Sequence, residues 1–169
     1  MYLETDLIKI KQLAAEREDE NYCFRAFLKE KDGKKVDSIV HRLHEKYVSL
    51  IDCTTCGNCC HCLKPRVEEE DIEILARLEN ISIEDYMASN CEEDFGDIYL
   101  KNKPCRYVDR KKCNIYENRP TQCRHFPYTD KEEFISRLWG MIGFYEICPI
   151  VFNLMEELKD RYRFYRKRN

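Results

Sequence analysis

The sequence predicts a mainly α fold of the α+β class, in which helices surround an irregular cysteine-rich core with one small β-hairpin. Three observations lead to this prediction. Apolar residues recur at helical spacing near both ends of the chain, 36% of the residues are charged, and five of the eleven cysteines lie between residues 53 and 62. A length of 169 residues suits one substantial core. We therefore expect a single domain, 1–169, with an N-terminal helical extension (1–50), a cysteine-cluster core (51–150) and a C-terminal helix (151–169).

Helices are expected at both ends of the chain. Apolar side chains recur every three or four positions over residues 3–14 and 36–47, which predicts two helices separated by the segment KEKDGKK. The C-terminal segment CPIVFNLMEELKDRYRFYRKRN places Pro149 in a first helical turn and cations near the last turn, where the helix dipole favours positive charge.

The middle of the chain is expected to be more varied. The acidic start of VEEEDIEILARLEN and its apolar stripe predict an amphipathic helix, and Ser82 with Asp85 predicts the start of a second, shorter one. Aromatic and β-branched residues on both sides of DRKK predict an antiparallel hairpin. The cysteine-rich stretch 53–62 and the proline-bracketed segment TQCRHFPY are expected to form irregular loops or tight turns.

The chemical signal begins with Cys53, Cys56 and Cys59, at successive spacings of three. Two cysteines that bracket a two-residue turn can direct both thiolates to one metal ion. A third cysteine at the same spacing is typical of the run that supplies three corners of an iron-sulfur cubane, whose remote fourth ligand is often followed by proline. Cys148 precedes a proline and fits that remote role, and the adjacent Cys60 indicates a second metal or another edge of a larger site.

Three further cysteines lie in contexts that suit metal ligands, namely after a proline, in the predicted hairpin and in the proline-bracketed segment. With them the predicted ligands number eight, enough for two four-coordinate sites or for one cluster and one mononuclear ion. Arg119 and Arg124 are candidates to contact the bound cofactor and to offset the negative charge of the thiolates. The predicted ligands are Cys53, Cys56, Cys59, Cys60, Cys105, Cys113, Cys123 and Cys148.

Other residues near the cluster carry weaker signals. Cys23 and Cys91 lie within helical patterns and are expected to pack as small apolar side chains. His61 and Cys62 could replace a ligand, although a neutral structural role is favoured. For His125 a surface or hydrogen-bonded position is expected.

The motif CTTCGNCC, followed by PCRYVDRKKCNIYENRPTQCRHFP and then CP, resembles the YkgJ-type cysteine-cluster family (CxxCxxCC), a zinc- or iron-chelating domain. The resemblance covers Cys53 to Pro149 and places the cysteines of the family at the same eight positions. It implies a module that binds an iron-sulfur cluster such as [4Fe-4S], or zinc or iron ions. Flagellin lysine methylases carry a similar cluster, but no glycine-rich nucleotide-binding loop supports that activity here. The extra Cys62 and the lack of a glycine after the Cys-Pro pair depart from the family pattern.

Charge is distributed unevenly, although the net charge is only -3. Residues 68–97 hold twelve acidic residues and one basic residue, a net charge of -11, whereas residues 98–128 hold eight basic and two acidic residues, a net charge of +6. Solvated helix faces and neutralisation of thiolates explain this pattern, and an acidic docking face for a protein partner is the alternative. The basic tail KDRYRFYRKRN could meet an acidic partner or RNA, but nucleic acid is not favoured because a solvated helix face explains the tail as well.

The first residues lack the features of a secretory signal, and no apolar run reaches the roughly 18 residues of a membrane span. We therefore expect a cytoplasmic protein without a membrane partner. Thiols stay reduced in that compartment, so dense cysteine spacing indicates metal binding before disulfides. Secretion by another route would restore disulfides as the main alternative.

The leading interpretation is a metal-binding protein in which the metal contributes much of the folding free energy. One alternative is a redox or radical-type metalloenzyme with an open iron site, lined by His125, Tyr116, Tyr128 and Arg124. No nucleophile with its base and no nucleotide-binding loop supports catalysis. The other alternative is an interaction protein stapled by zinc, and the sequence does not separate zinc from iron-sulfur.

Overall fold

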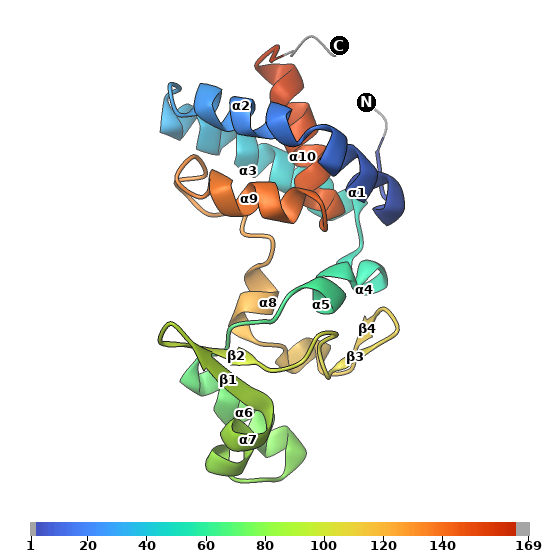
Figure 1. Ribbon diagram of the computed structural model, residues 1–169, viewed down its shortest axis with the longest axis vertical. Coiled ribbons are helices and arrows are strands. Elements are labelled where there is room, and N and C mark those ends of the chain that lie inside the picture. The colour runs from blue at the N-terminus through green and yellow to red at the C-terminus, as the bar shows by residue number, and fades with distance from the viewer. Residues whose placement is uncertain (1–2, 165–169) are drawn as a thin grey trace. The chain divides into compact units, whose positions relative to one another are not determined.

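The computed structural model describes residues 3–164 and divides the chain into two compact units (Figure 1). The helical unit consists of Met1–Asp52 together with Pro127–Asn169, and the cysteine unit is Cys53–Phe126. The chain therefore leaves the helical unit after residue 52 and returns to it at residue 127. The predicted mainly helical fold with a small antiparallel β component is confirmed.

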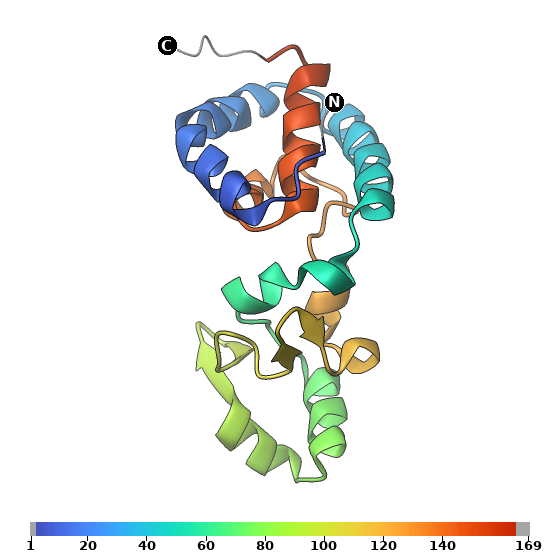
Figure 2. The same ribbon diagram turned by 90° about the vertical axis from the view of Figure 1, so that its right-hand side faces the viewer.

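The helical unit is built around its last helix. Ten of the 13 residues of this helix, α10 (Pro149–Arg161), are buried. It packs against the helices α1, α3 and α9, as Figure 2 shows. Proline occupies its first turn, as predicted. The helices of the unit are α1 (Leu7–Glu16), α2 (Glu18–Leu28), α3 (Gly33–Leu50), α9 (Leu138–Tyr145) and α10 (Pro149–Arg161).

The first 50 residues form three helices, so the prediction of two was wrong. The backbone leaves the helical region at Arg17, with φ -107° and ψ 13°, which separates α1 from α2. The side chain of Arg17 pairs with Glu156 of α10, a contact that local sequence periodicity does not encode. The second break was predicted correctly, because Asp32 caps α3 by accepting hydrogen bonds from the backbone N–H groups of Lys34 and Lys35.

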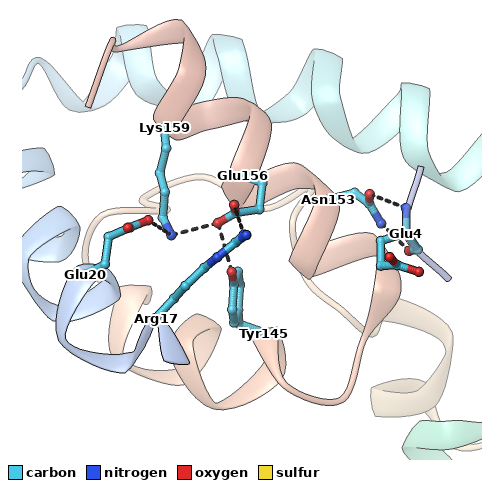
Figure 3. A network of polar contacts seen from close by, with 7 residues as sticks. All are labelled: Glu4, Arg17, Glu20, Tyr145, Asn153, Glu156 and Lys159. Atoms are coloured by element: carbon cyan, nitrogen blue, oxygen red, sulfur yellow. Dashed lines mark hydrogen bonds and ion pairs between the residues drawn. The ribbon is translucent and has the colours of Figure 1, made fainter. Parts of the chain in front are cut away.

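A buried polar network links α2, α9 and α10 (Figure 3). The Lys159 side chain is only 4% exposed, and its Nζ lies 2.9 Å from Glu20 Oε1 and 2.7 Å from Glu156 Oε1. Arg17 pairs with the same Glu156, and the Tyr145 hydroxyl donates a hydrogen bond to it over 2.8 Å. Two cations thus face two carboxylates, so the charges that the unit buries balance one another.

The segment before α1 is tied to α10 through amide hydrogen bonds. Asn153 Nδ2 donates to the Glu4 carbonyl over 2.7 Å, and the Glu4 backbone N–H donates to Asn153 Oδ1 over 2.9 Å (Figure 3). Both residues are buried, so each polar group finds its partner inside the unit.

The cysteine unit contains five short helices, one 3₁₀ turn and two β-hairpins. The strands pair antiparallel, with Cys91 opposite Leu100 in the first hairpin and Val108 opposite Cys113 in the second. The elements are α4 (Cys53–Cys56), α5 (Asn58–Cys62), α6 (Glu69–Glu79), α7 (Ile83–Asn90), β1 (Cys91–Asp94), β2 (Asp97–Leu100), β3 (Val108–Asp109), β4 (Lys112–Cys113), η1 (Tyr116–Asn118) and α8 (Thr121–His125).

Several predictions for this unit are confirmed. The hairpin at DRKK is β3–β4, and the amphipathic helix after the cysteine cluster is α6. Ser82 caps α7, because its Oγ accepts a hydrogen bond from the Asp85 backbone N–H over 3.0 Å.

Three local predictions were wrong. The stretch 53–62 forms the short helices α4 and α5, and TQCRH forms α8. Cys91 lies in β1 rather than in a helix. The β1–β2 hairpin escapes sequence reasoning because its strands are rich in acidic residues, which are depleted in strands, and its turn places Phe95 as well as Gly96 at positive φ.

The apolar core of the cysteine unit is small. It is formed by α6, α7 and the first hairpin, and Tyr86 and Leu75 at its centre are fully buried. Cys105, Tyr107 and Ile115 pack against its edge from the cysteine-rich side of the unit. The core comprises Val67, Ile72, Leu75, Ala76, Tyr86, Cys91 and Leu100.

Among the described residues, no single helix is long and apolar enough to cross a membrane. In the same described range, α9 and α10 taken together reach that length and composition, and the chain bends by 116° between them.

Glu157 of α10 gives the helical unit a defined response to acid. Burial alone would raise the pKa of this carboxyl, but hydrogen bonds from Lys46, Tyr47 and Arg161 outweigh burial and lower the pKa to about 2. A carboxyl with a lowered pKa stabilises the fold above its ordinary pKa of 4.5, and this contribution is lost as the pH falls through the folded value.

We expect Glu157→Gln to lower stability at pH 7 by about 1–2 kcal/mol, because the Lys46 and Arg161 side chains are 44% exposed and screened by solvent. The difference from the wild type should shrink between about pH 5 and pH 2. Urea unfolding followed by fluorescence of Trp139, the single tryptophan of the chain and a residue of α9, measures this in the helical unit. A difference that stays constant over this pH range would contradict the assignment.

Candidate metal centre

Four cysteines from four segments of the cysteine unit interact electrostatically. They are Cys60 in α5, Cys105 before β3, Cys113 in β4 and Cys123 in α8. Burial, which is the largest cause, and the charges of the other three cysteines together raise the pKa of the Cys123 thiol to about 12. Burial also raises the pKa values of Cys105 and Cys113, and Cys60 adds to both shifts. Coulomb interaction falls with distance, so these shifts indicate that the four cysteines lie in one region of the cysteine unit.

Backbone hydrogen bonds bring the first three of these cysteines together. The Cys105 N–H donates to the Cys60 carbonyl over 2.8 Å, which joins α5 to the segment before the hairpin. The Val108 N–H then donates to the Cys105 carbonyl over 3.0 Å, and Val108 pairs with Cys113 across the hairpin. Cys105 and Cys113 are therefore fixed on one hairpin, and α5 is attached to its base.

Asp71 positions the helix that carries Cys123. This carboxylate is 4% exposed and accepts hydrogen bonds from the Thr121 backbone N–H and hydroxyl, over 2.9 and 3.0 Å, at the start of α8. Its other oxygen accepts from the Glu68 backbone N–H over 3.1 Å, which caps α6. One buried side chain thus joins the N-termini of α6 and α8.

The thiol of Cys60 differs from its three neighbours. A hydrogen bond from Cys59 lowers the pKa of Cys60 to about 7, with help from His61 and against the effect of burial. A thiol with this pKa is deprotonated more readily than an ordinary cysteine, and the thiolate is the form that binds metals.

The other predicted ligands of the motif lie on α4 and α5. Cys53 is exposed, Cys56 and Cys59 are half-buried, and α4 packs against β4. Cys148 belongs to the helical unit, where it is 6% exposed and precedes the first turn of α10. Seven of the eight predicted ligands therefore belong to the cysteine unit, and a ligand role for Cys148 stays a prediction.

The four thiols lie in one region of the unit, but they are not arranged as the ligands of a metal ion. Within residues 3–164, no group of three or more histidine, cysteine, aspartate or glutamate side chains is placed so that it could hold a metal ion. All eleven cysteines lie in this range, and none forms a disulfide. Coordination by the four cysteines would therefore require their sulfur atoms to come closer together than they are in this structure.

Two residues beside the cluster use their polar atoms within the protein. His61 Nε2 donates to the Arg110 carbonyl over 2.5 Å, so this nitrogen is not available as a ligand. The Cys62 thiol lies 3.7 Å from the Asn58 side-chain oxygen, one turn earlier in α5. These contacts agree with the expected structural role of both residues.

The two predicted cofactor-binding arginines hold the backbone near the cluster. Arg124 donates to the carbonyls of Arg119 and Glu117, over 2.9 and 3.2 Å. The Arg119 guanidinium lies 3.8 Å from the centre of the Tyr116 ring, and its charge lowers the pKa of Cys113 against the larger effect of burial. Arg119 is thus close enough to influence a thiolate, whereas contact of either arginine with a cofactor stays a prediction.

The residues proposed to line an open iron site belong to different units. Tyr116 and the exposed His125 lie in the cysteine unit, as does Arg124, whereas Tyr128 lies in the helical unit. The Tyr128 carbonyl accepts a hydrogen bond from Arg137 of the same unit over 2.6 Å.

Sequence reasoning missed two positioning residues of the centre. Asp71 was noticed only as part of an acidic first turn, and its contact with Thr121 spans 50 positions of sequence. Gly57 has φ +60° between α4 and α5, and a Cβ there would lie 2.5 Å from the Lys111 carbonyl oxygen. A glycine inside a cysteine motif was the one available signal for a close backbone contact.

The cysteine unit matches a known family. The model of the family CxxCxxCC, described as "Putative zinc- or iron-chelating domain", matches residues 52–139, which include Cys53 to Cys123 and exclude Cys148. This match confirms the cysteine-cluster family expected from the motifs. No curated protein and no solved structure is significantly similar to the chain.

The role of Asp71 can be tested by Asp71→Asn, which replaces one acceptor oxygen by an amide donor. Loss of the negative charge weakens the hydrogen bonds to Thr121 as well as the α6 cap, so we expect a loss of about 1–3 kcal/mol of stability and faster amide exchange over 121–126. Hydrogen-deuterium exchange of the full chain measures the local effect. The control is Asp85→Asn at the exposed start of α7, where a change within about 0.5 kcal/mol is expected. Equal exchange over 121–126 in both variants would contradict this role.

Proposed function

Because the chain belongs to the CxxCxxCC family, we propose that its cysteine unit binds zinc, iron or an iron-sulfur cluster through a four-thiolate centre. The ligands of this centre are Cys60, Cys105, Cys113 and Cys123. One observation carries the proposal: the pKa values of Cys105, Cys113 and Cys123 are each raised in part by cysteines from other segments of the chain, and Cys60 contributes to all three shifts.

The donor atoms fit such a group. All four are sulfurs, and thiolates are preferred ligands of zinc and of iron-sulfur clusters. Burial and mutual repulsion keep three of these thiols protonated on their own, and a bound cation would remove both obstacles by stabilising the thiolates. Cys60, with its lowered pKa, is suited to bind first.

A metal held by four thiolates has no open coordination position and acts mainly as a structural staple. The cysteine unit has only seven buried apolar residues in its core, and the cysteine-rich segments lie at the edge of this core. A structural metal site contributes on the order of 10 kcal/mol, comparable to the stability of a whole domain. We therefore propose that the metal holds α5, the β3–β4 hairpin and α8 together.

The remaining predicted ligands extend the proposal to a second ion or a larger cluster. Cys53 and Cys56 lie on α4, which packs next to β4, and Cys59 forms a hydrogen bond with Cys60. These three cysteines therefore border the proposed four-thiolate centre. With these three, the candidate ligands within the cysteine unit number seven. The metal stoichiometry decides between one ion, two ions and a cluster. A reducing compartment such as the cytoplasm would keep these thiols available.

Metal removal tests the proposal directly. We expect the anaerobically purified chain to contain zinc or iron, and chelation to increase amide exchange strongly over 53–126 while α10 stays protected. Elemental analysis gives the metal, and visible charge-transfer absorption distinguishes an iron-sulfur cluster from colourless zinc. Unchanged exchange in verified metal-free protein would reject the staple.

Single cysteine variants test the ligand set. Cys60→Ser and Cys123→Ser should each weaken metal binding by at least about a hundredfold, because one thiolate bond is lost from a four-coordinate site. Cys23→Ser is the matched control, since Cys23 is exposed on α2 of the helical unit. Competition with a chromophoric chelator measures the affinity. Wild-type affinity in either ligand variant would remove that cysteine from the centre.

A further inference from the structure

The cysteine motif makes a backbone-to-backbone contact with the turn of the β3–β4 hairpin at Gly57. A Cβ built on this glycine would lie 2.5 Å from the Lys111 carbonyl oxygen and 2.9 Å from the Lys111 Cα and carbonyl carbon. Real Cβ atoms do not approach backbone this closely, so any side chain at position 57 would push the motif and the turn apart. The positive φ of Gly57 adds a second, separate demand for glycine.

We infer that Gly57 is a positioning residue of the metal centre, which sets the distance between the CTTCGNCC motif and the hairpin that carries Cys105 and Cys113. This inference rests on the proposed function. It identifies the contact that holds the CTTCGNCC motif against the segment that carries Cys105 and Cys113. Cys60 lies three residues after Gly57, and its N–H donates to the Gly57 carbonyl over 3.1 Å. A displacement at position 57 is therefore passed directly to a ligand.

Two further contacts hold the same pair of segments together. His61 Nε2 donates to the carbonyl of Arg110, the residue before Lys111, and the Cys105 N–H donates to the Cys60 carbonyl. Arg110 has φ +56°, so the turn that presents these two carbonyls is itself in the left-handed region. The Arg110 carbonyl thus accepts a hydrogen bond from His61, and the Lys111 carbonyl packs closely against Gly57.

The cysteine unit offers a matched control for this contact. Gly96, in the β1–β2 turn, also has positive φ, +83°, but a Cβ there meets nothing within 4 Å. Asparagine tolerates the left-handed region better than other residues with a side chain. Asparagine therefore relieves the demand on φ at either position, whereas no residue other than glycine relieves the overlap with Lys111.

The experiment compares Gly57→Ala, Gly57→Asn, Gly96→Ala and Gly96→Asn in the full chain. Co²⁺ is the probe, because its absorption reports how many thiolates bind and in which geometry, and competition with Zn²⁺ gives the affinity. We expect both Gly57 variants to bind Co²⁺ at least about tenfold more weakly than the wild type, with a weaker thiolate charge-transfer band. Both Gly96 variants should keep the wild-type spectrum and an affinity within about twofold, which corresponds to about 0.4 kcal/mol.

Wild-type binding by Gly57→Asn would overturn the inference, because glycine would then serve the backbone conformation alone. Wild-type binding by Gly57→Ala would overturn it as well. A wild-type chain that contains no iron as purified and takes up neither Co²⁺ nor Zn²⁺ would instead reject the proposed function, and with it any role of Gly57 in metal binding. Amide exchange of the hairpin, 108–113, is measured on the same metal-free samples. Faster exchange in both Gly57 variants than in the Gly96 variants is expected, and equal exchange would show that the contact does not hold the turn.

Discussion

The stability of the cysteine unit depends on its cluster of thiols. Burial and mutual repulsion disfavour their thiolate forms, and a bound cation would relieve both effects. Burial raises the pKa values of Cys105, Cys113 and Cys123, so these groups are poor anions unless a cation is near. A carbonyl contact and strand pairing nevertheless join the segments of Cys60, Cys105 and Cys113, and the Asp71 side chain ties the helix of Cys123 to α6. A protein gains little from such convergence of sulfur unless a metal joins the set, which is why the family assignment and the electrostatics point the same way.

The helical unit is stabilised in a different manner. Its central helix α10 is buried over most of its length, and the charges that come with it are paired inside the unit. Lys159 and Arg17 share Glu156, so removing any one charged member would leave the positive and negative charges of this network unbalanced. Apolar burial and balanced charge stabilise this unit, whereas the cysteine unit has a small core and a concentration of sulfur. The two units should therefore respond differently to acid and to chelators.

Periodicity and spacing predicted what is local in this molecule. The helices α6 and α7, the cap at Ser82 and the hairpin at DRKK depend on neighbouring residues, and the sequence predicts them correctly. The break at Arg17 and the β1–β2 hairpin depend on tertiary contacts or on unusual turn residues, which the pattern does not reveal. The cysteines proposed as ligands could be selected from the sequence spacing alone. Which of the cysteines become neighbours depends on the chain path, and so do Asp71 and Gly57, whose partners lie about 50 residues away.

The order of the two units along the chain has a consequence for biosynthesis. The cysteine unit is inserted between α3 and the segment that begins at Pro127, so the ribosome completes it before α9 and α10 are made. Domains fold as units while the nascent chain emerges. All the residues of the cysteine unit have been translated before α9 and α10, so this unit can bind its metal without them. The first three helices must wait, with their apolar faces uncovered, until α10 arrives to fill the space among them. A chaperone that shields nascent apolar surface would therefore have its longest task at the N-terminal helices.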